Sequence, residues 1–264
     1  SKDKRIHYYR NETNIGAAAN YNKVFTLARG EYFKWAAHDD VCSVEYLNEC
    51  VDKLDEDKSI ILCYSREIAI NEFGNIISDY MLKYKKLTHN LSNAPCKRLL
   101  DLCCVKHGCY QIFGLMRSSL LRKTNLIGSY IGADRVLLSE LAMHGKFWES
   151  KTPIYYRRHP NQYCALKSVE VRAAWYSPEV YNQDSVSQTT PHNEYNVISR
   201  QLKEYLLSIK RVDLTLKDQF KCYGVMLLWL LKKRKRLRVE LVLNLKQWLI
   251  ARFSPPPQAH NKSR

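Results

Sequence analysis

The sequence predicts an α/β fold, in which a mainly parallel sheet is flanked by helices and followed by a basic helical appendage at the C-terminal end. Three observations lead to this prediction. Strand-like and helix-like patterns alternate along roughly the first 160 residues, as in domains built on a parallel sheet. A largely apolar strand runs directly into two adjacent carboxylates. The last quarter of the chain is strongly basic.

The N-terminal segment shows two strands on either side of a helix. Residues 6–9 form a short β-rich run, and Gly16 lies in a turn. Residues 17–28 have the apolar spacing of a helix, and Gly30 stands where a helix-terminating glycine is expected. Residues 31–37 are largely apolar, which is typical of a buried strand in a parallel sheet.

The next segments continue the alternation. Ser43 is in position to cap a helix that starts at Val44, and Gly74 lies in a hairpin turn. We therefore expect helices at residues 44–54, 95–105, 118–124 and 133–144, and strands at residues 59–65, 110–116, 146–148 and 154–157.

The chain divides into a larger α/β domain and a C-terminal helical region. A polar stretch that contains Pro178 and Pro191 is typical of a linker. The last residues are rich in proline and polar side chains, and we expect them to be disordered. The prediction is an α/β domain at 1–175, a linker at 176–196, a basic amphipathic helical region at 197–253 with helices near 197–209, 216–233 and 237–253, and a disordered tail at 254–264.

Composition indicates a folded cytoplasmic protein. The chain has 264 residues, of which 45% are hydrophobic, and this is too apolar for a disordered protein. None of the nine cysteines forms a Cys-x-x-Cys pair, so we expect reduced, mostly buried thiols. The longest apolar run, residues 223–231, is shorter than the about 20 residues that a bilayer-spanning helix needs.

Positive charge is concentrated at the C-terminal end. The formal net charge is +16, and residues 200–264 hold 16 of the 42 Lys and Arg but only 4 of the 26 Asp and Glu. Such a region suits an anionic partner. Because the apolar residues 227–231 directly precede the basic residues 232–236, we expect peripheral contact with an anionic membrane. Nucleic-acid binding is the alternative, but no known nucleic-acid module accompanies this run, so we expect no nucleic acid.

The two carboxylates after the second strand are the first candidate site. Asp39 and Asp40 follow the apolar run directly. In an open α/β sheet, ligands bind beyond the carboxyl ends of the strands. Carboxylate oxygens there suit Mg²⁺ or Mn²⁺ holding a diphosphate. The alternative is an ordinary turn in which Asp40 caps the next helix.

Four linked motifs resemble the family 2 glycosyltransferases of GT-A fold, whose sheet is Rossmann-like. The resemblance extends to about residue 161, and the linked order is more specific than any single motif. The motifs are Arg10-Asn11, Asn14-x-Gly16-x-x-x-Asn20, Ala28-Arg29-Gly30-Glu31-Tyr32 and the acidic pair, followed by Gly132-Ala133-Asp134-Arg135 and Arg157-Arg158-His159-Pro160.

The resemblance implies a transferase that moves a sugar from a nucleoside diphosphate donor to a glycan, lipid or other hydroxyl acceptor. It also implies inversion at the anomeric carbon and a divalent cation, Mg²⁺ or Mn²⁺. The family's Asp-x-Asp motif falls on residues 37–39, so the resemblance makes Asp39 the metal ligand, with Asp40 beside it. The first Asp is replaced by Ala37, which leaves the ribose contact in doubt or transfers it to His38.

The resemblance assigns the remaining site residues in the same way. Asp134 matches the general base, although an aspartate that opens a helix also suits capping. His159 matches a position that completes the metal site, or else simply faces solvent. Arg158, or the neighbouring Arg157, is placed to neutralise the leaving diphosphate. Residues expected to shape the nucleotide-sugar pocket are Asn14, Gly16 and Asn20.

The strands with which family members begin have no counterpart before Ser1. We therefore expect this chain to start within the α/β domain, with about 60 residues missing by average element lengths. A chain of this kind is expected not to turn over a sugar nucleotide by itself. A catalytically inactive relative is a further alternative, because Ala37 replaces an expected aspartate.

Overall fold

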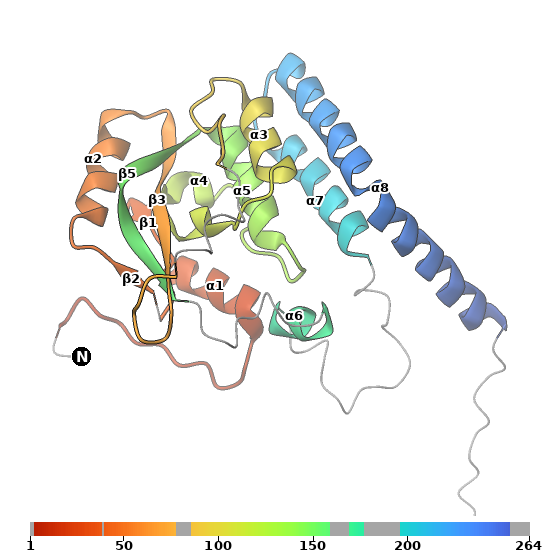
Figure 1. The fold of residues 1–264 in the computed structure, drawn as a ribbon, viewed down its shortest axis with the longest axis horizontal. Helices are drawn as coiled ribbons and strands as arrows, with labels where there is room; N and C mark the ends of the chain where they lie inside the picture. Colours follow the sequence, from red (N-terminus) through yellow and green to blue (C-terminus); the bar gives the residue numbers. More distant parts are fainter. Residues whose placement is uncertain (1–2, 39, 78–85, 159–168, 177–195, 254–264) are drawn as a thin grey trace, which may run out of the picture.

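The sheet has five strands in the part of the chain that the computed structural model describes, which is residues 3–38, 40–77, 86–158, 169–176 and 196–253 (Figure 1). The strand order is β1-β4-β3-β5-β2. The strands are β1 (Tyr32–Phe33), β2 (Val41–Cys42), β3 (Ile60–Ile70), β4 (Leu115–Arg117) and β5 (Lys146–Arg158).

Three of these strands run in one direction. The long strands β3 and β5 pair in parallel, from Ile60 beside Lys146 to Ile70 beside Arg158. Strand β4 is antiparallel to both β1 and β3, so β1 runs the same way as β3 and β5. Strand β2 is antiparallel to β5. Strands β1, β3 and β5 therefore run toward the same edge of the sheet, although β1 ends level with Leu62, near the start of β3. The predicted α/β fold with a mainly parallel sheet is confirmed.

Helices cover both faces of the sheet (Figure 1). Successive side chains of a strand point to opposite faces, so Leu62 and Tyr64 pack into a different cluster from Cys63. The Leu62 face is covered by α1 (Gly16–Leu27), α4 (Ser118–Leu121) and α5 (Ala133–His144), and the Cys63 face by α2 (Tyr46–Glu56).

A second core joins the C-terminal helices to the α/β domain. It lies between α3 (Pro95–Cys104), α5, α7 (Val197–Arg211) and α8 (Leu216–Phe253). Trp229 of α8 is buried there, with its ring 5.4 Å from that of Tyr205. The first half of α8 thus packs against the domain. No helix among the described residues combines the length and the apolar character that crossing a membrane requires.

The C-terminal helices differ from the prediction in number. One 38-residue helix, α8, replaces the two helices expected near 216–233 and 237–253. After Gly224 the helix contains neither glycine nor proline, so nothing in its sequence interrupts it. The linker predicted at 176–196 and the tail at 254–264 lie almost wholly outside the described residues.

Strand β5 also differs from the prediction, because it continues through Pro153, where the sequence indicated two strands. The register with β3 shifts between Ser65 and Glu67, which pair with Ser150 and Tyr155. The proline lies within this irregularity, and it has no N–H for a regular ladder.

Three smaller predictions were wrong. Residues 6–9 form no strand, and their large apolar side chains are exposed. Tyr110–Phe113 is a turn of 3₁₀ helix, so the predicted strand is shortened to β4. The cap position of α2 is Glu45, so Ser43 does not cap it. The helix α6 (Val169–Tyr176) was not predicted.

A buried ion pair links α5 to α7. Two of the three guanidinium nitrogens of Arg211 donate to Glu140, with Nε 2.8 Å from Oε1 and Nη2 2.7 Å from Oε2. The hydroxyl of Ser208 donates to the same carboxylate at 2.7 Å. The Glu140 side chain is only 2% exposed, so these donors replace the water that burial removes. The same hydrogen bonding raises the pKa of Arg211.

Removing the arginine should destabilise the protein strongly. Arg211→Ala leaves the Glu140 carboxylate buried without its counter-charge, and we expect the free energy of unfolding to fall by about 3 kcal/mol. Lys210→Ala, on the same turn but exposed, should cost less than about 1 kcal/mol. Urea unfolding of the two variants measures both values. Equal, small effects would show that the ion pair does not hold α7 in place.

Candidate functional site

The acidic segment, residues 38–40, connects β1 to β2 at the edge of the sheet toward which β3 and β5 run. His38 is exposed and Asp40 is partly buried, while Asp39 lies outside the described residues. Val41 follows Asp40 and pairs with Tyr156, two residues before the end of β5 at Arg158. Strand pairing therefore brings the acidic segment close to the end of β5.

The end of β5 carries the second group of predicted residues. The backbone of Arg158 is paired with that of Ile70 at the last register position of β3 and β5. The side chain of Arg158 and all of His159 lie outside the described parts of the structure. The structure thus supports the expected position of the Arg158 backbone, and the role of either side chain stays a prediction.

A lysine that sequence reasoning missed lies close to the acidic segment. Lys34 follows β1, and its Nζ donates to the carbonyl oxygen of Trp35 at 3.0 Å. Partial burial lowers the pKa of Lys34, and the nearby groups Cys42 and Asp40 act in the opposite direction. Lys34, which directly follows β1, therefore places an ammonium group near Asp40.

Helix α1 begins with the predicted pocket residues. Gly16 has φ of 77°, a left-handed conformation that favours glycine, and it is buried. The Asn14 Oδ1 accepts a hydrogen bond from the N–H of Gly16 at 3.0 Å, which fixes the entry to the helix. The Asn20 Oδ1 accepts from the Nδ2 of Asn11 at 3.0 Å. The three residues thus share one turn-and-helix unit, with Asn14 and Asn20 exposed.

Aromatic packing fixes α1 to β1. Phe33 lies between Phe25 and Trp35, with ring centroids 4.9 Å from each and edge-to-face geometry. The indole N–H of Trp35 donates to the carbonyl oxygen of Tyr21 at 3.0 Å. These contacts hold the start of the acidic segment against α1.

The candidate base lies in the first turn of α5. Gly132, with φ of 84°, is the N-cap residue, so Asp134 does not occupy the cap position. The Asp134 Oδ1 accepts from the N–H of Arg135 at 2.8 Å, and the side chain is partly buried. The N-terminal end of a helix favours a negative charge. The carboxylate of Asp134 is therefore partly open to solvent at the start of the helix.

Arg135 holds this turn against α3. Its guanidinium donates to the carbonyl oxygens of Leu102 and His107 at 2.9 and 2.8 Å. Burial, followed by the positive charge of Arg135, lowers the pKa of His107 to about 4. His107 is thus neutral near pH 7, and it stabilises the loop by accepting from the N–H of Cys109 at 3.1 Å. We interpret both side chains as structural.

Two amides hold the loop that precedes α5, and sequence reasoning missed both. The side chain of Asn22 exchanges hydrogen bonds with the backbone of Ile127, at 2.9 and 3.0 Å. The Gln201 Nε2, from α7, donates to the carbonyl oxygen of Ile131 at 2.9 Å. An asparagine inside a helix is a weak signal of such a contact, because its helix propensity is low. For Gln201 the sequence offers no signal.

The metal-binding prediction rests on the chemistry of the donor set. Among the residues the structure describes, no group of three or more His, Cys, Asp or Glu is arranged to hold a metal ion. Asp39 and His159, two of the three predicted ligands, lie outside that part. Carboxylate oxygens suit Mg²⁺ or Mn²⁺ by ligand type, and Asp40 is the predicted ligand that lies within the described residues.

Comparison with known proteins supports the resemblance found in the sequence. Residues 1–123 match the model of the family described as Glycosyl transferase family 2. An uncharacterized glycosyltransferase of Methanocaldococcus jannaschii is 35% identical over 85 residues, which is 32% of this chain and 29% of the relative. An uncharacterized glycosyltransferase of Rickettsia conorii is 34% identical over 114 residues, which is 40% of this chain and 17% of the relative.

The matches cover only part of this chain and part of each relative. The chain covers less than a third of either relative's length. The family match ends at Lys123, before α5 and the end of β5. The predicted family resemblance is therefore confirmed for residues 1–123, which include α1, β1 and the acidic segment.

Proposed function

We propose that this chain, whose residues 1–123 match glycosyl transferase family 2, acts in the transfer of a sugar from a nucleoside diphosphate donor to a hydroxyl acceptor on a glycan or a lipid. The observation that supports this most is the acidic segment of the matched region, which strand pairing brings close to the carboxyl ends of β3 and β5. That edge is where open α/β sheets bind ligands.

Asp134 is the proposed general base. It would take the proton from the acceptor hydroxyl as that oxygen attacks the anomeric carbon, and attack opposite the leaving group would invert the configuration. The hydrogen bonds of Asn22 and Gln201 to the preceding loop support this role, because they fix the start of α5 from two sides. A catalytic group must be held in place in this way.

Asp39, Asp40 and His159 would hold Mg²⁺ or Mn²⁺, which when bound stabilises negative charge on the leaving diphosphate. Arg158, at the end of β5, would add a second positive charge there. His38 is exposed beside the acidic segment and would contact the ribose in place of the aspartate that Ala37 replaces. Asn14, Gly16 and Asn20 would form the wall of the donor pocket.

Replacing the proposed base should lower turnover without weakening donor binding. Asp134→Asn keeps the size of the side chain and an oxygen that accepts from the Arg135 N–H, but it removes the basicity. We expect kcat for sugar transfer by the full-length protein to fall by about 10² or more at nearly unchanged donor affinity. Asp218→Asn, in the first turn of α8, is the control and should retain kcat. A wild-type kcat in Asp134→Asn would place the base elsewhere.

Removal of the metal should abolish transfer. Treatment with EDTA should remove activity and added Mn²⁺ or Mg²⁺ should restore it, because the leaving diphosphate loses its counter-charge. Asp39→Ala should remain inactive at all metal concentrations, whereas Asp52→Ala, an exposed carboxylate on α2, should behave as wild type. Unchanged transfer after both EDTA and Asp39→Ala would show that transfer needs no metal. A wild-type protein without any transfer would support the inactive-relative alternative.

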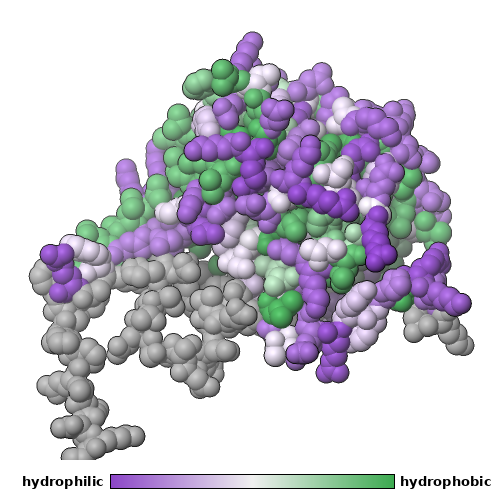
Figure 2. Space-filling view, turned by 180° about the vertical axis from the view of Figure 1, so that it is seen from behind, coloured by the Kyte–Doolittle hydropathy of each residue, from purple (hydrophilic) through white to green (hydrophobic). Residues whose placement is uncertain are grey.

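The outer face of α8 is the proposed contact with an anionic membrane. Large apolar side chains recur there at intervals of three, four, seven or eleven residues, opposite the face that packs on the domain. Figure 2 shows the hydrophobic and hydrophilic side chains intermixed along this part of the molecule. The outer apolar stripe consists of Leu216, Phe220, Leu227, Leu231, Val242, Leu245 and Leu249, all 40% or more exposed.

A membrane explains this stripe better than nucleic acid does. Arg234 and Arg238 lie between the leucines of the stripe, and an acidic surface would gain about 1 kcal/mol for each basic side chain near it. Nucleic acid would use the charges but leave the leucines in water. A helix that lies in the membrane plane buries both, and it would bring a lipid-linked acceptor close to the domain.

Polar substitutions in the stripe should weaken membrane binding. Leu227→Ser with Leu245→Ser removes two exposed leucines, and we expect at least about a ten-fold loss of partitioning onto acidic vesicles in flotation assays. The control is Leu47→Ser with Leu91→Ser, which changes two leucines outside α8 that are also exposed, by 48% and 55%. Binding of the wild type should also weaken with salt. Equal binding of both double variants, or binding of an oligonucleotide but not of vesicles, would contradict the proposal.

A further inference from the structure

A surface groove lies between α3 and α8, away from the edge of the sheet where the site is proposed. Its volume is about 890 Å³. Three leucines line one part of it and a run of basic residues lines the other. The residues that matter to its chemistry are Leu100, Leu228 and Leu231 on the apolar side and Lys232, Lys235 and Arg236 on the basic side.

We propose that this groove binds the phosphate headgroup of an anionic lipid, with the first part of the hydrocarbon chain against the leucines. The inference rests on the membrane contact proposed for α8 and adds a specific binding site to it. Lys and Arg donate charge-assisted hydrogen bonds to phosphate oxygens, and the leucines cover apolar atoms that free phosphate does not have.

No carboxylate of α8 neutralises the basic side of the groove. The helix has no Asp or Glu between Asp218 and Glu240. The Glu240 carboxylate is occupied elsewhere, because it accepts from the backbone N–H groups of Ile198 and Ser199 at the start of α7, at 2.6 and 3.2 Å. The positive charge of the groove is therefore not neutralised by a carboxylate of α8.

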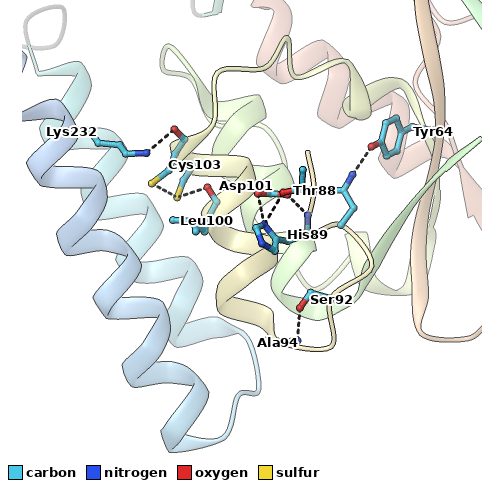
Figure 3. A network of polar contacts seen from close by, with 11 residues as sticks. Tyr64, Thr88, His89, Ser92, Ala94, Leu100, Asp101, Cys103 and Lys232 are labelled. Atoms are coloured by element: carbon cyan, nitrogen blue, oxygen red, sulfur yellow. Dashed lines mark hydrogen bonds and ion pairs between the residues drawn. The ribbon is translucent and has the colours of Figure 1, made fainter. Parts of the chain in front are cut away.

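The carboxylate of α3 nearest to the groove in the sequence is occupied as well. Asp101 is 2% exposed, and it accepts from the backbone N–H of His89 at 2.6 Å and contacts the His89 ring at 2.9 Å (Figure 3). The pKa of Lys233 is lowered by burial and then by the neighbouring Arg236, as expected where basic groups crowd together. Both observations agree with an unbalanced positive charge at this place.

One basic side chain already reaches across the groove. The Nζ of Lys232 lies 3.5 Å from the carbonyl oxygen of Cys104 at the end of α3. Figure 3 shows the Lys232 side chain pointing toward that end of α3. This long contact is a weak hydrogen bond. A phosphate oxygen is a stronger acceptor for the same ammonium group, so Lys232 is placed to turn to a ligand at little cost.

The groove opens onto the face that is proposed to meet the membrane. Leu231 belongs both to the outer apolar stripe and to the lining of the groove, and Leu228 beside it is 51% exposed. A lipid can therefore enter the groove while its hydrocarbon chains remain in the membrane. This continuity favours a lipid over a soluble phosphate compound.

The test compares two pairs of lysines on the same helix. Lys232→Gln with Lys235→Gln alters the groove, and Lys217→Gln with Lys221→Gln removes the same charge from exposed positions near the start of α8. Binding is measured to phosphatidylcholine vesicles that contain phosphatidic acid, and to vesicles that contain oleate at the same zeta potential. Circular dichroism verifies that both variants fold.

The proposal predicts a preference of the wild type for phosphatidic acid. The groove variant should lose about ten-fold in affinity for these vesicles and lose the preference, while the control variant keeps the preference. Equal losses in both variants on both vesicles would overturn the groove and leave general membrane attraction. Displacement by inorganic phosphate would overturn the lipid assignment in favour of a soluble ligand. Absence of wild-type binding to either vesicle would overturn the membrane contact itself.

Discussion

Burial of α5 on both sides is the constraint on which the rest of the structure depends. Leu137, Leu138 and Leu141 of this helix pack into the core above the sheet, whereas Val136 and Met143 pack into the core shared with α3, α7 and α8. A helix enclosed in this way has few surfaces left to solvate its polar groups. Arg98 of α3 therefore donates to the carbonyl oxygens of Ala142 and Met143 at the C-terminal end of α5. Arg211 of α7 neutralises Glu140 of α5.

The same enclosure makes the C-terminal helices part of the α/β domain in structural terms. Gln201 of α7 contacts the loop that leads into Asp134. A Cβ added to Gly132 would lie only 2.2 Å from the Nε2 of Gln201. The conformation of the turn before Asp134 thus depends on a residue nearly 70 positions further along the chain. The C-terminal helices, of which α8 is proposed to face the membrane, thus also help to fix the position of the proposed base through Gln201 of α7.

The sequence allowed much of this fold to be predicted, for reasons that differ between elements. The bounds of α5 were predicted correctly because glycines flank a regular apolar pattern. Strand β5 was divided in two because Pro153 marks a strand end unless the ladder is irregular there, and such an irregularity depends on the neighbouring strand. The continuity of α8 was missed because its charged middle section resembles a boundary when no packing partner is known.

The candidate site was predicted through the resemblance to a family, and the supporting contacts were not. Asp40 and Asp134 stand in recognisable motifs, and the structure places them at the carboxyl edge and in the first turn of α5. Asn22, Gln201 and Lys34 belong to no motif, because their importance arises only from residues distant in the sequence. Contacts of this kind follow from tertiary structure alone.

The length of α8 has a consequence for evolution. At 38 residues and a rise of about 1.5 Å per residue, the helix is about 57 Å long, and only its first half carries the large side chains of the second core. Substitutions on the inner face are limited by this packing and, further along, by the hydrogen bonds of Glu240 to the start of α7, whereas the outer face is free of these limits. Related proteins can therefore change the surface to which they attach by varying α8 alone, without altering the domain that it supports.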